Sequence, residues 1–240
     1  MARKLASRRI SFMRAARSAR TNSRVINMSS LATVRPGRES GRIGLLGGSF
    51  NPAHAGHLQL SLVALKRLRL DAVWWMVSPQ NPLKAASGMA PLEDRMKSAR
   101  LAARHPRIYV TDIERHLASR YTADTLRQLR QRFPQASFVW LMGADNMLQI
   151  PRWKRWAEIF ETTPVAVIAR PEYCWNAMHG KAATRFQRSR LGPHLGPHAA
   201  GSLATRRAPA WTYTPMRLNP TSATDIRSGR QSPFGGPWAS

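Results

Sequence analysis

Two histidines beside a glycine-containing turn are the side chains of this 240-residue chain best placed to do chemistry. His54 and His57 flank Gly56, a few residues after the turn Gly47-Gly48-Ser49-Phe50. Imidazole N–H groups at this spacing can donate hydrogen bonds to one phosphate chain, and paired glycines let the backbone come close to it. These residues therefore predict a phosphate-binding site.

The elements on either side of the turn explain how it could hold an anion. The apolar run Ile43–Leu46 predicts a buried strand, and apolar residues at helical spacing over Leu58–Leu70 predict a helix. Backbone N–H groups at the start of a helix have no partner within it and carry partial positive charge. A strand, a turn of small residues and a helix start together form an anion-binding arrangement.

This stretch resembles the signature of the nucleotidyltransferase superfamily, which is H-x-G-H behind a G-G-[ST]-F-x-P loop. The match includes His54, Gly56, His57 and Pro52 together with the glycine turn. One position departs from the pattern, because many members of the superfamily have Asp where this chain has Asn51. We expect activity to survive that change, since the loop amides and the histidines are the groups that face the phosphates.

A second phosphate motif lies near the end of the chain. The hexapeptide Ser222–Arg227 resembles the superfamily's S-[SA]-T-x-I-R signature. A hydroxyl-capped helix start offers N–H donors to an anion, and Arg227 adds a planar guanidinium suited to phosphate oxygens. Taken alone, the hexapeptide would indicate an ordinary capped surface helix. With the first motif present, we expect it to complete the site.

Three segments between these motifs narrow the resemblance to bacterial nicotinate-mononucleotide adenylyltransferases. Ser119–Leu126 is similar to that family's S-Y-T-x-x-T-L segment, Gly143–Asp145 to its G-x-D segment, and Ile150–Trp153 to its P-x-W segment. The similarity covers most of residues 43–229. It implies a reaction in which ATP transfers its adenylyl group to nicotinate mononucleotide, giving deamido-NAD and pyrophosphate with magnesium.

The resemblance also implies roles for individual residues. His54, His57 and Arg227 would act on the phosphates during transfer, and Mg²⁺ would neutralise the leaving pyrophosphate. The implied ATP-binding residues are Gly47, Gly48, Ser49, Phe50, His54, His57, Ser222, Thr224, Ile226 and Arg227. The candidate acceptor-binding residues are Lys84, Tyr121, Thr122, Gly143, Asp145 and Trp153. Of these, the Tyr121–Thr122 backbone would meet the nicotinate carboxylate and Trp153 would stack on the pyridine, whereas Lys84 could equally be a solvated loop lysine.

Strands and helices alternate along the rest of the chain. The patterns predict strands over 72–77, 108–113, 136–142, 165–169 and 211–216, and helices over 91–104, 122–133, 153–160 and 182–190, with a last helix from residue 222. Such alternation predicts an α/β fold, a Rossmann-like doubly wound parallel sheet with helices on both faces. In these sheets ligands bind beyond the carboxyl ends of the strands, where the motif-bearing loops are expected to lie.

The charge of the chain is strongly basic, with 38 Lys and Arg against 12 Asp and Glu and a net charge of +26. Such an excess often indicates a nucleic-acid partner. The excess is densest in residues 1–42, which hold 11 basic residues and 1 acidic residue. This is also the part of the chain with the weakest pattern of strands and helices. We therefore expect a disordered basic extension over 1–42, one nucleotidyltransferase domain over 43–229 and a disordered tail over 230–240. The extension also has the composition of a mitochondrial transit peptide, and Met28 is an alternative start.

The partners and location follow from these features. The single cysteine, Cys174, allows no disulfide within the chain, which fits a reducing cytoplasm. No stretch approaches the roughly 20 apolar residues of a membrane helix. We expect ATP and nicotinate mononucleotide as partners, without membrane or nucleic acid. Two alternatives remain: another H-x-G-H enzyme, such as a pantetheine-phosphate adenylyltransferase or a cytidylyltransferase, or a basic nucleic-acid-binding protein on this fold.

Overall fold

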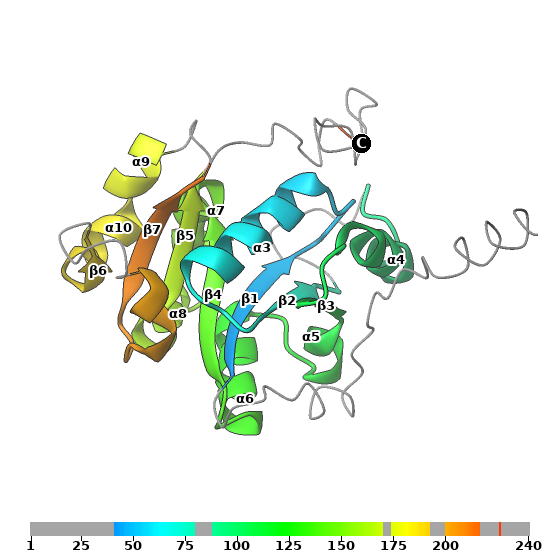
Figure 1. Ribbon diagram of the computed structural model, residues 1–240, viewed down its shortest axis with the longest axis horizontal. Helices are drawn as coiled ribbons and strands as arrows, with labels where there is room; N and C mark the ends of the chain where they lie inside the picture. Colours follow the sequence, from blue (N-terminus) through cyan, green and yellow to red (C-terminus); the bar gives the residue numbers. More distant parts are fainter. Residues whose placement is uncertain (1–40, 80–87, 170–173, 193–199, 217–225, 227–240) are drawn as a thin grey trace, which may run out of the picture.

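A seven-stranded parallel sheet forms the centre of the molecule in the computed structural model, which describes residues 41–79, 88–169, 174–192, 200–216 and 226. The strands lie in the order β3-β2-β1-β4-β5-β7-β6, and each neighbouring pair is parallel. Their bounds are β1 Arg42–Gly48, β2 Ala72–Val77, β3 Ile108–Thr111, β4 Ser137–Gly143, β5 Val165–Ala169, β6 Arg190–Leu191 and β7 Trp211–Pro215. The predicted doubly wound parallel sheet is confirmed (Figure 1).

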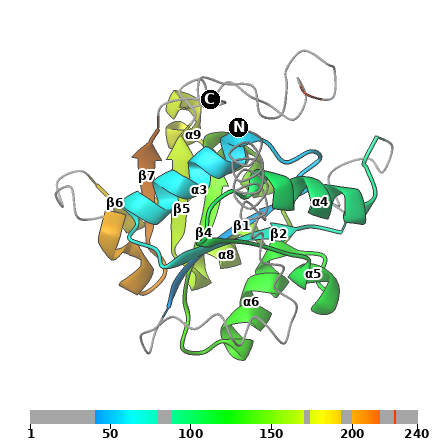
Figure 2. The same cartoon turned by 45° about the vertical axis from the view of Figure 1, so that its right-hand side comes forward.

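Helices cover both faces of this sheet (Figure 2). One face carries α3 (Ala55–Arg67), α4 (Leu92–Ala102) and the 3₁₀ helix η5 (Ala200–Thr205). The other carries α5 (Ile113–His116), α6 (Thr122–Arg132), α7 (Ala144–Gln149), α8 (Trp156–Thr162), α9 (Cys174–His179) and α10 (Lys181–Arg185). Two further 3₁₀ turns are η1 (Ile150–Arg152) and η3 (Gln187–Ser189). The sheet therefore has a separate apolar core on each side.

Strand β2 illustrates how the sequence produces two cores. All six of its residues are apolar and buried, as expected of a central parallel strand covered on both faces. Because side chains alternate along a strand, Trp74 packs into the core beneath α5 and α6, while Trp75 packs into the core beneath α3 and α4. Both rings are at most 1% exposed. The aromatic pair Trp74–Trp75 thus contributes to the stability of both layers.

Several predicted elements differ from the structure at their ends; the helix expected over 58–70, for example, is α3 at Ala55–Arg67. The strand expected over 108–113 stops at Thr111, and Ile113 instead begins α5 and packs into the helix layer. The helix expected over 153–160 begins at Trp156, because Trp153 is extended after η1 and Arg155 adopts a left-handed conformation (φ 54°). The helix expected over 182–190 ends at Arg185, and η3 and β6 follow it. Short apolar runs do not distinguish a strand end from a helix start, which explains these differences.

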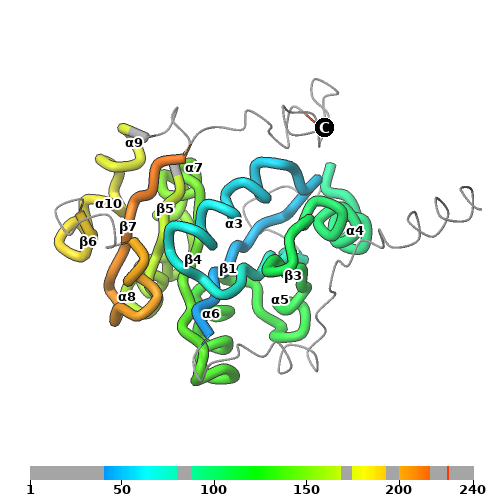
Figure 3. Tube along the Cα trace, viewed as in Figure 1, coloured from blue at the N-terminus to red at the C-terminus, as the bar shows by residue number. Residues whose placement is uncertain are grey.

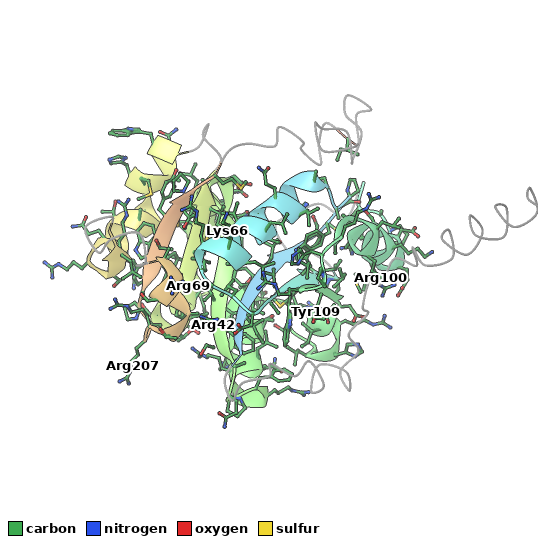
Figure 4. All side chains as sticks on the ribbon, viewed as in Figure 1. Arg42, Lys66, Arg69, Arg100, Tyr109 and Arg207 are labelled. Atoms are coloured by element: carbon green, nitrogen blue, oxygen red, sulfur yellow. The ribbon has the colours of Figure 1, made fainter. Side chains whose placement is uncertain are left out.

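The edge of the sheet beyond β5 includes α9 and β6, which the sequence analysis did not predict. In Figure 3, α9, α10 and β6 gather beside β7. Figure 4 shows Lys66 on α3, Arg100 on α4 and Arg207 in the connection between η5 and β7. None of the helices within the described ranges is long and apolar enough to cross a bilayer.

Candidate active site

The loop between β1 and α3 lies where the strand order of the sheet reverses. β1 pairs with β2 on one side and with β4 on the other, so the chain winds in opposite directions from this strand. Ligands of doubly wound sheets bind at this point, outside the carboxyl ends of the strands. The predicted phosphate loop, residues 47–57, leaves β1 here and leads into α3.

His54 and His57 form the first turn of α3 together. His54 is the N-cap, and its Nδ1 accepts a hydrogen bond from the Gly56 N–H at 3.1 Å. The Nδ1 of His57 in turn accepts from the N–H of His54 at 3.2 Å, which completes a capping box made of two imidazoles. The two rings are 3.9 Å apart between centroids, and His54 is only 3% exposed.

These contacts fix which ring nitrogen carries the proton. A nitrogen that accepts a hydrogen bond from a backbone N–H presents its lone pair, so Nδ1 of each neutral ring is unprotonated. The proton of each ring is then on Nε2, which makes Nε2 of both histidines a donor. The structure therefore brings two imidazole N–H donors together at a helix N-terminus, as predicted for a phosphate site.

Aromatic packing supports the loop from below. Phe50, 2% exposed and in the left-handed region at φ 46°, stacks on Trp75 at 5.2 Å and lies 4.8 Å from the His57 ring. A Cβ built on Gly47 would lie 2.5 Å from Cη2 of Trp140, so only glycine fits there. The structure thus gives Gly47 a packing reason to be glycine, in addition to the predicted close approach of a ligand.

The atypical Asn51 ties the loop to the segment before α4. Its amide nitrogen donates to the Gly88 carbonyl at 3.0 Å, and its carbonyl accepts from the Ala90 N–H at 3.3 Å. An aspartate could accept but not donate in this position. The amide thus binds both polar groups of the segment, which accounts for this departure from the family pattern.

Arg95 is a residue of the site that motif analysis missed. It is 2% exposed, and its guanidinium donates to four carbonyl groups: Ser49 at 2.8 Å, Ser78 at 2.7 Å, Pro79 at 2.8 Å and Ala90 at 2.9 Å. Burial lowers the pKa of Arg95 from its ordinary value. The side chain joins the loop after β1 to the loop after β2. In the sequence, Arg95 lies one helical turn before Ala99, on the face of α4 that is otherwise apolar. A basic residue at such a buried position is the feature by which Arg95 could have been predicted.

The predicted acceptor residues Tyr121 and Thr122 lie at the start of α6. Tyr121 is the N-cap in an extended conformation, and Thr122 is the first helical residue. A cleft of about 600 Å³ opens beside them, lined by Pro79, Glu114, Arg115, Ala118, Ser119, Arg120 and Tyr121. Since Arg95 holds Pro79, this cleft adjoins the loop after β2 and thereby the phosphate loop.

The segment carrying Trp153 lies against the same helix start. Lys154 Nζ lies 4.6 Å from the centre of the Tyr121 ring, and Arg155 forms an ion pair with Asp124 in the first turn of α6. Trp153 itself is half-buried and contacts the Trp140 ring edge-on, at 6.4 Å between centroids. The structure therefore brings the segments of Tyr121 and Trp153 together, although they are about thirty residues apart in the sequence.

Gly143 and Asp145 lie at the end of β4, next to β1. Gly143 is the N-cap of α7, and Asp145 is half-buried in the first turn of that helix. A side chain on Gly143 would collide with the Asp145 carboxylate, so Asp145 turns back over Gly143. Gly143 rather than Asp145 is thus the N-cap residue of α7.

Known proteins similar to this chain show the family to which it belongs. Residues 45–229 match the family described as cytidylyltransferase-like. A Cereibacter sphaeroides protein named "probable nicotinate-nucleotide adenylyltransferase" is 50% identical over 186 residues, covering 78% of this chain and 96% of that protein. A protein of the same name from Methylorubrum extorquens is 51% identical over 188 residues, covering 78% of this chain and 99% of that protein. The chain belongs to the nicotinate-nucleotide adenylyltransferase family.

Solved structures agree on the fold. Nicotinic acid mononucleotide adenylyltransferase of Plasmodium falciparum, complexed with APC, superposes with a TM-score of 0.56 at 14% identity, over 78% of this chain and 83% of that one. At this identity the likeness concerns the fold alone. Because it covers 78% of this chain, it extends well beyond the phosphate loop.

Part of the site expected in this family lies outside the described residues. Lys84, Ser222, Thr224 and Arg227 are among them, as are the extension over 1–40 and the tail over 230–240. Ile226 is described, as a half-buried helical residue. Strand β1 begins at Arg42, one residue before the expected domain boundary. Within the described ranges no three His, Cys, Asp or Glu side chains gather as a metal site.

Proposed function

We propose that this protein transfers the adenylyl group of ATP to nicotinate mononucleotide, releasing pyrophosphate and forming deamido-NAD. The observation that carries the proposal is the pair His54–His57, whose Nδ1 atoms both accept backbone N–H groups at the switch point of the sheet. Relatives with half of their residues in common are named for this activity. The proposal gives each half of the site one substrate.

The phosphate loop is proposed to bind ATP. The acceptor's phosphate oxygen attacks the α-phosphorus of ATP in line, and the bond from that phosphorus to the pyrophosphate oxygen breaks. Negative charge grows on the leaving pyrophosphate, and Nε2–H of His54 and of His57 donate to phosphate oxygens as it does so. The α3 N-terminus adds partial positive charge. Ser222, Thr224, Ile226 and Arg227 are proposed to hold the outer phosphates.

The cleft beside α6 is proposed to bind the acceptor. Backbone N–H groups near Tyr121 and Thr122 would pair with the nicotinate carboxylate, and the partial positive charge at the α6 start favours an anion there. Trp153 is proposed to stack on the pyridine, and Asp145 to accept from a ribose hydroxyl. The contacts of Lys154 and Arg155 with α6 support this assignment, because they hold the Trp153 segment beside Tyr121.

Magnesium is proposed to enter as part of the substrate, coordinated by the phosphates of ATP. Mg²⁺ keeps several waters and commonly takes only one or two protein carboxylates in such sites. We further propose a cytoplasmic location, on the grounds of the single cysteine.

A pyrophosphate-release assay with ATP and a panel of acceptors tests the proposal. The panel contains nicotinate mononucleotide, nicotinamide mononucleotide and phosphopantetheine, with CTP and glycerol phosphate as a separate pair. We expect the highest catalytic efficiency with nicotinate mononucleotide. Preference for phosphopantetheine or for CTP would assign the protein to another branch of the superfamily, and no turnover with any acceptor would favour the nucleic-acid alternative.

A further inference from the structure

Glu114 is a buried acid at the cleft beside α6. It lies on the short helix α5, is 9% exposed, and lines the cleft together with Pro79, Ser119 and Tyr121. Acidic side chains are seldom this buried unless they are paired or hydrogen-bonded. The phosphate and acceptor roles proposed above leave Glu114 without a function.

The contacts of Glu114 join two loops that are far apart in sequence. Its carboxyl group is hydrogen-bonded to the side chains of Ser78, after β2, and Thr125, in the first turn of α6. Thr125 Oγ1 also lies 2.8 Å from Ser119 Oγ, and both hydroxyls lie within hydrogen-bond distance of the Tyr121 carbonyl. Thr125 therefore links Glu114 to Tyr121, the N-cap residue of α6.

Ser78 extends these bonds to the phosphate loop. Its N–H donates to the Gly48 carbonyl at 2.9 Å, and its carbonyl accepts from Arg95 at 2.7 Å. A continuous chain of hydrogen bonds therefore runs from Gly48 through Ser78, Glu114 and Thr125 to Tyr121. Deleting the carboxyl group would break this chain at its middle and leave buried hydroxyls without one of their partners.

We propose that Glu114 is a positioning residue of the acceptor site, which holds the acceptor loop, residues 119–122, against the loop after β2. The inference rests on the proposed function only in taking the cleft beside Tyr121 as the acceptor site. It does not depend on which acceptor binds there.

The charge of Glu114 makes the positioning role testable through the pH dependence of acceptor binding. Burial raises the pKa of Glu114 to about 7, although hydrogen bonds from Ser78 and Thr125 act in the opposite direction. The carboxyl group therefore changes charge near neutral pH, in a cleft proposed to bind an acceptor with a negatively charged phosphate. The ionised form repels such an acceptor, whereas the protonated form does not.

Other charged groups surround Glu114 on the described elements, and most have partners. Arg115 pairs with Glu93 of α4, His116 with Asp112, and Asp124 of α6 with Arg127 and Arg155. Arg120 lies at the rim of the cleft, and Arg95 lies behind Ser78. Strand β2 has no ionisable side chain, and β3 contributes only Tyr109.

The test compares Glu114→Ala and Glu114→Gln with the wild type in steady-state kinetics. Alanine removes the carboxyl group, so we expect the KM of the acceptor to rise about tenfold while the KM of ATP changes less than about twofold. Glutamine has the shape of the protonated acid and still bonds both hydroxyls, so at pH 6 its acceptor KM should match that of the wild type. Glu161→Gln is the matched control, because Glu161 is exposed and its ion-pair partner within the described residues is Arg185.

The second measurement is the ratio of acceptor KM between wild type and Glu114→Gln at pH 6 and pH 8. We expect a ratio near one at pH 6 and about threefold or more at pH 8, since only the wild type becomes charged. Titration of the acceptor's own phosphate cancels in this ratio. If Glu114→Ala does not fold, the pH comparison with Glu114→Gln stands by itself.

The outcomes separate this inference from the proposed function. If the wild type uses another acceptor from the panel, the same comparison is made with that acceptor, so the positioning role is tested even where the nicotinate assignment fails. Equal increases in KM for ATP and acceptor would mean a merely structural role and overturn the inference. Parallel pH profiles of wild type and Glu114→Gln would overturn it as well.

Discussion

The phosphate loop and the acceptor loop, residues 119–122, are built in different ways, although they lie at the same edge of one sheet. In the phosphate loop the hydrogen bonds that orient the chemistry are local, from His54 to Gly56 and from His57 back to His54. The acceptor loop has local hydrogen bonds as well, from Ser119 to the Tyr121 carbonyl and to Thr125, but other elements also hold it. Glu114 on α5 is hydrogen-bonded to Ser78 after β2 and to Thr125, and the Lys154 ammonium lies over the Tyr121 ring. A local motif therefore orients the histidines of the first loop, whereas contacts from other elements contribute to the second.

This difference predicts how each loop responds to mutation. A change in the phosphate loop should affect transfer itself, because the groups that bind phosphate and the groups that shape the loop are the same histidines. A change around the acceptor loop should affect one substrate more than the other. Four experiments test that comparison.

The largest effect is expected from the histidines. Replacing His57 with Ala removes an Nε2–H donor to the developing charge and should lower kcat about 10²-fold or more, as measured by pyrophosphate release. For His54, Asn is the better replacement, because Asn also caps helices and keeps α3 intact. His105→Ala, outside the site, serves as the control. Unchanged turnover in both variants would remove the phosphate-site assignment.

The next effect concerns the choice between acid and amide acceptors. If backbone N–H groups near Tyr121 face the carboxylate, the amide of nicotinamide mononucleotide would place a donor against a donor. A buried unpaired donor costs about 1–3 kcal/mol, so we expect roughly a ten- to a hundredfold preference in kcat/KM for the acid. Trp153→Ala should lower kcat/KM equally for both acceptors, because stacking does not depend on the ring substituent. Trp175 is exposed, so Trp175→Ala should lower kcat/KM for neither. Equal use of acid and amide by the wild type would contradict the acceptor-loop assignment.

The site divides in the same way between what the sequence predicts and what it does not. His54, His57 and the glycine turn were predictable because their partners lie within a few residues, so a short motif contains the whole arrangement. The sheet was predictable because apolar strands alternate with amphipathic helices. Glu114 and Lys154 were not, since their partners lie in other elements and no local pattern specifies them. For Arg95 the helical period of α4 indicates burial but not the carbonyl groups that it binds. The short helices α5 and α7 were missed because each has too few residues to show a period.

Arg95 tests whether the two loops are coupled in stability. Lysine keeps the charge but has three donors on one nitrogen instead of a planar fork, so Arg95→Lys leaves at least one of the four carbonyls without a donor. We expect the free energy of unfolding to fall by about 2–4 kcal/mol in denaturant titration. Arg185→Lys, at an exposed ion pair, should change it by less than about 0.5 kcal/mol. An unchanged midpoint for Arg95→Lys would mean that the loops are held together by other contacts.

The smallest effect is expected from the basic extension, which belongs to neither loop. Its charge bias and lack of apolar periodicity predict that deleting residues 1–40 leaves the melting temperature and kcat/KM nearly unchanged. Gly41 and Arg42, the next two residues, are bound to the domain. The Gly41 carbonyl accepts a hydrogen bond from the Ser137 N–H. The Arg42 backbone N–H and guanidinium both donate to the Asp71 carboxylate, at 2.8 and 3.0 Å. Arg42 also lowers the pKa of Asp71 through this hydrogen bond.

Deleting residues 1–42 is therefore the matched comparison. It removes an exposed ion pair and the first sheet contacts of β1, and we expect a loss of about 1–2 kcal/mol, seen as a lower melting temperature. The contribution of the pair should itself fall on acidification, because the pKa of Asp71 is depressed and protonation of the carboxylate breaks it. Hence the two deletions should differ at pH 7 and approach one another as the pH falls below the ordinary range of an aspartate pKa. A large drop in melting temperature for the shorter deletion would show that the extension packs on the domain, and that the fold begins before Gly41.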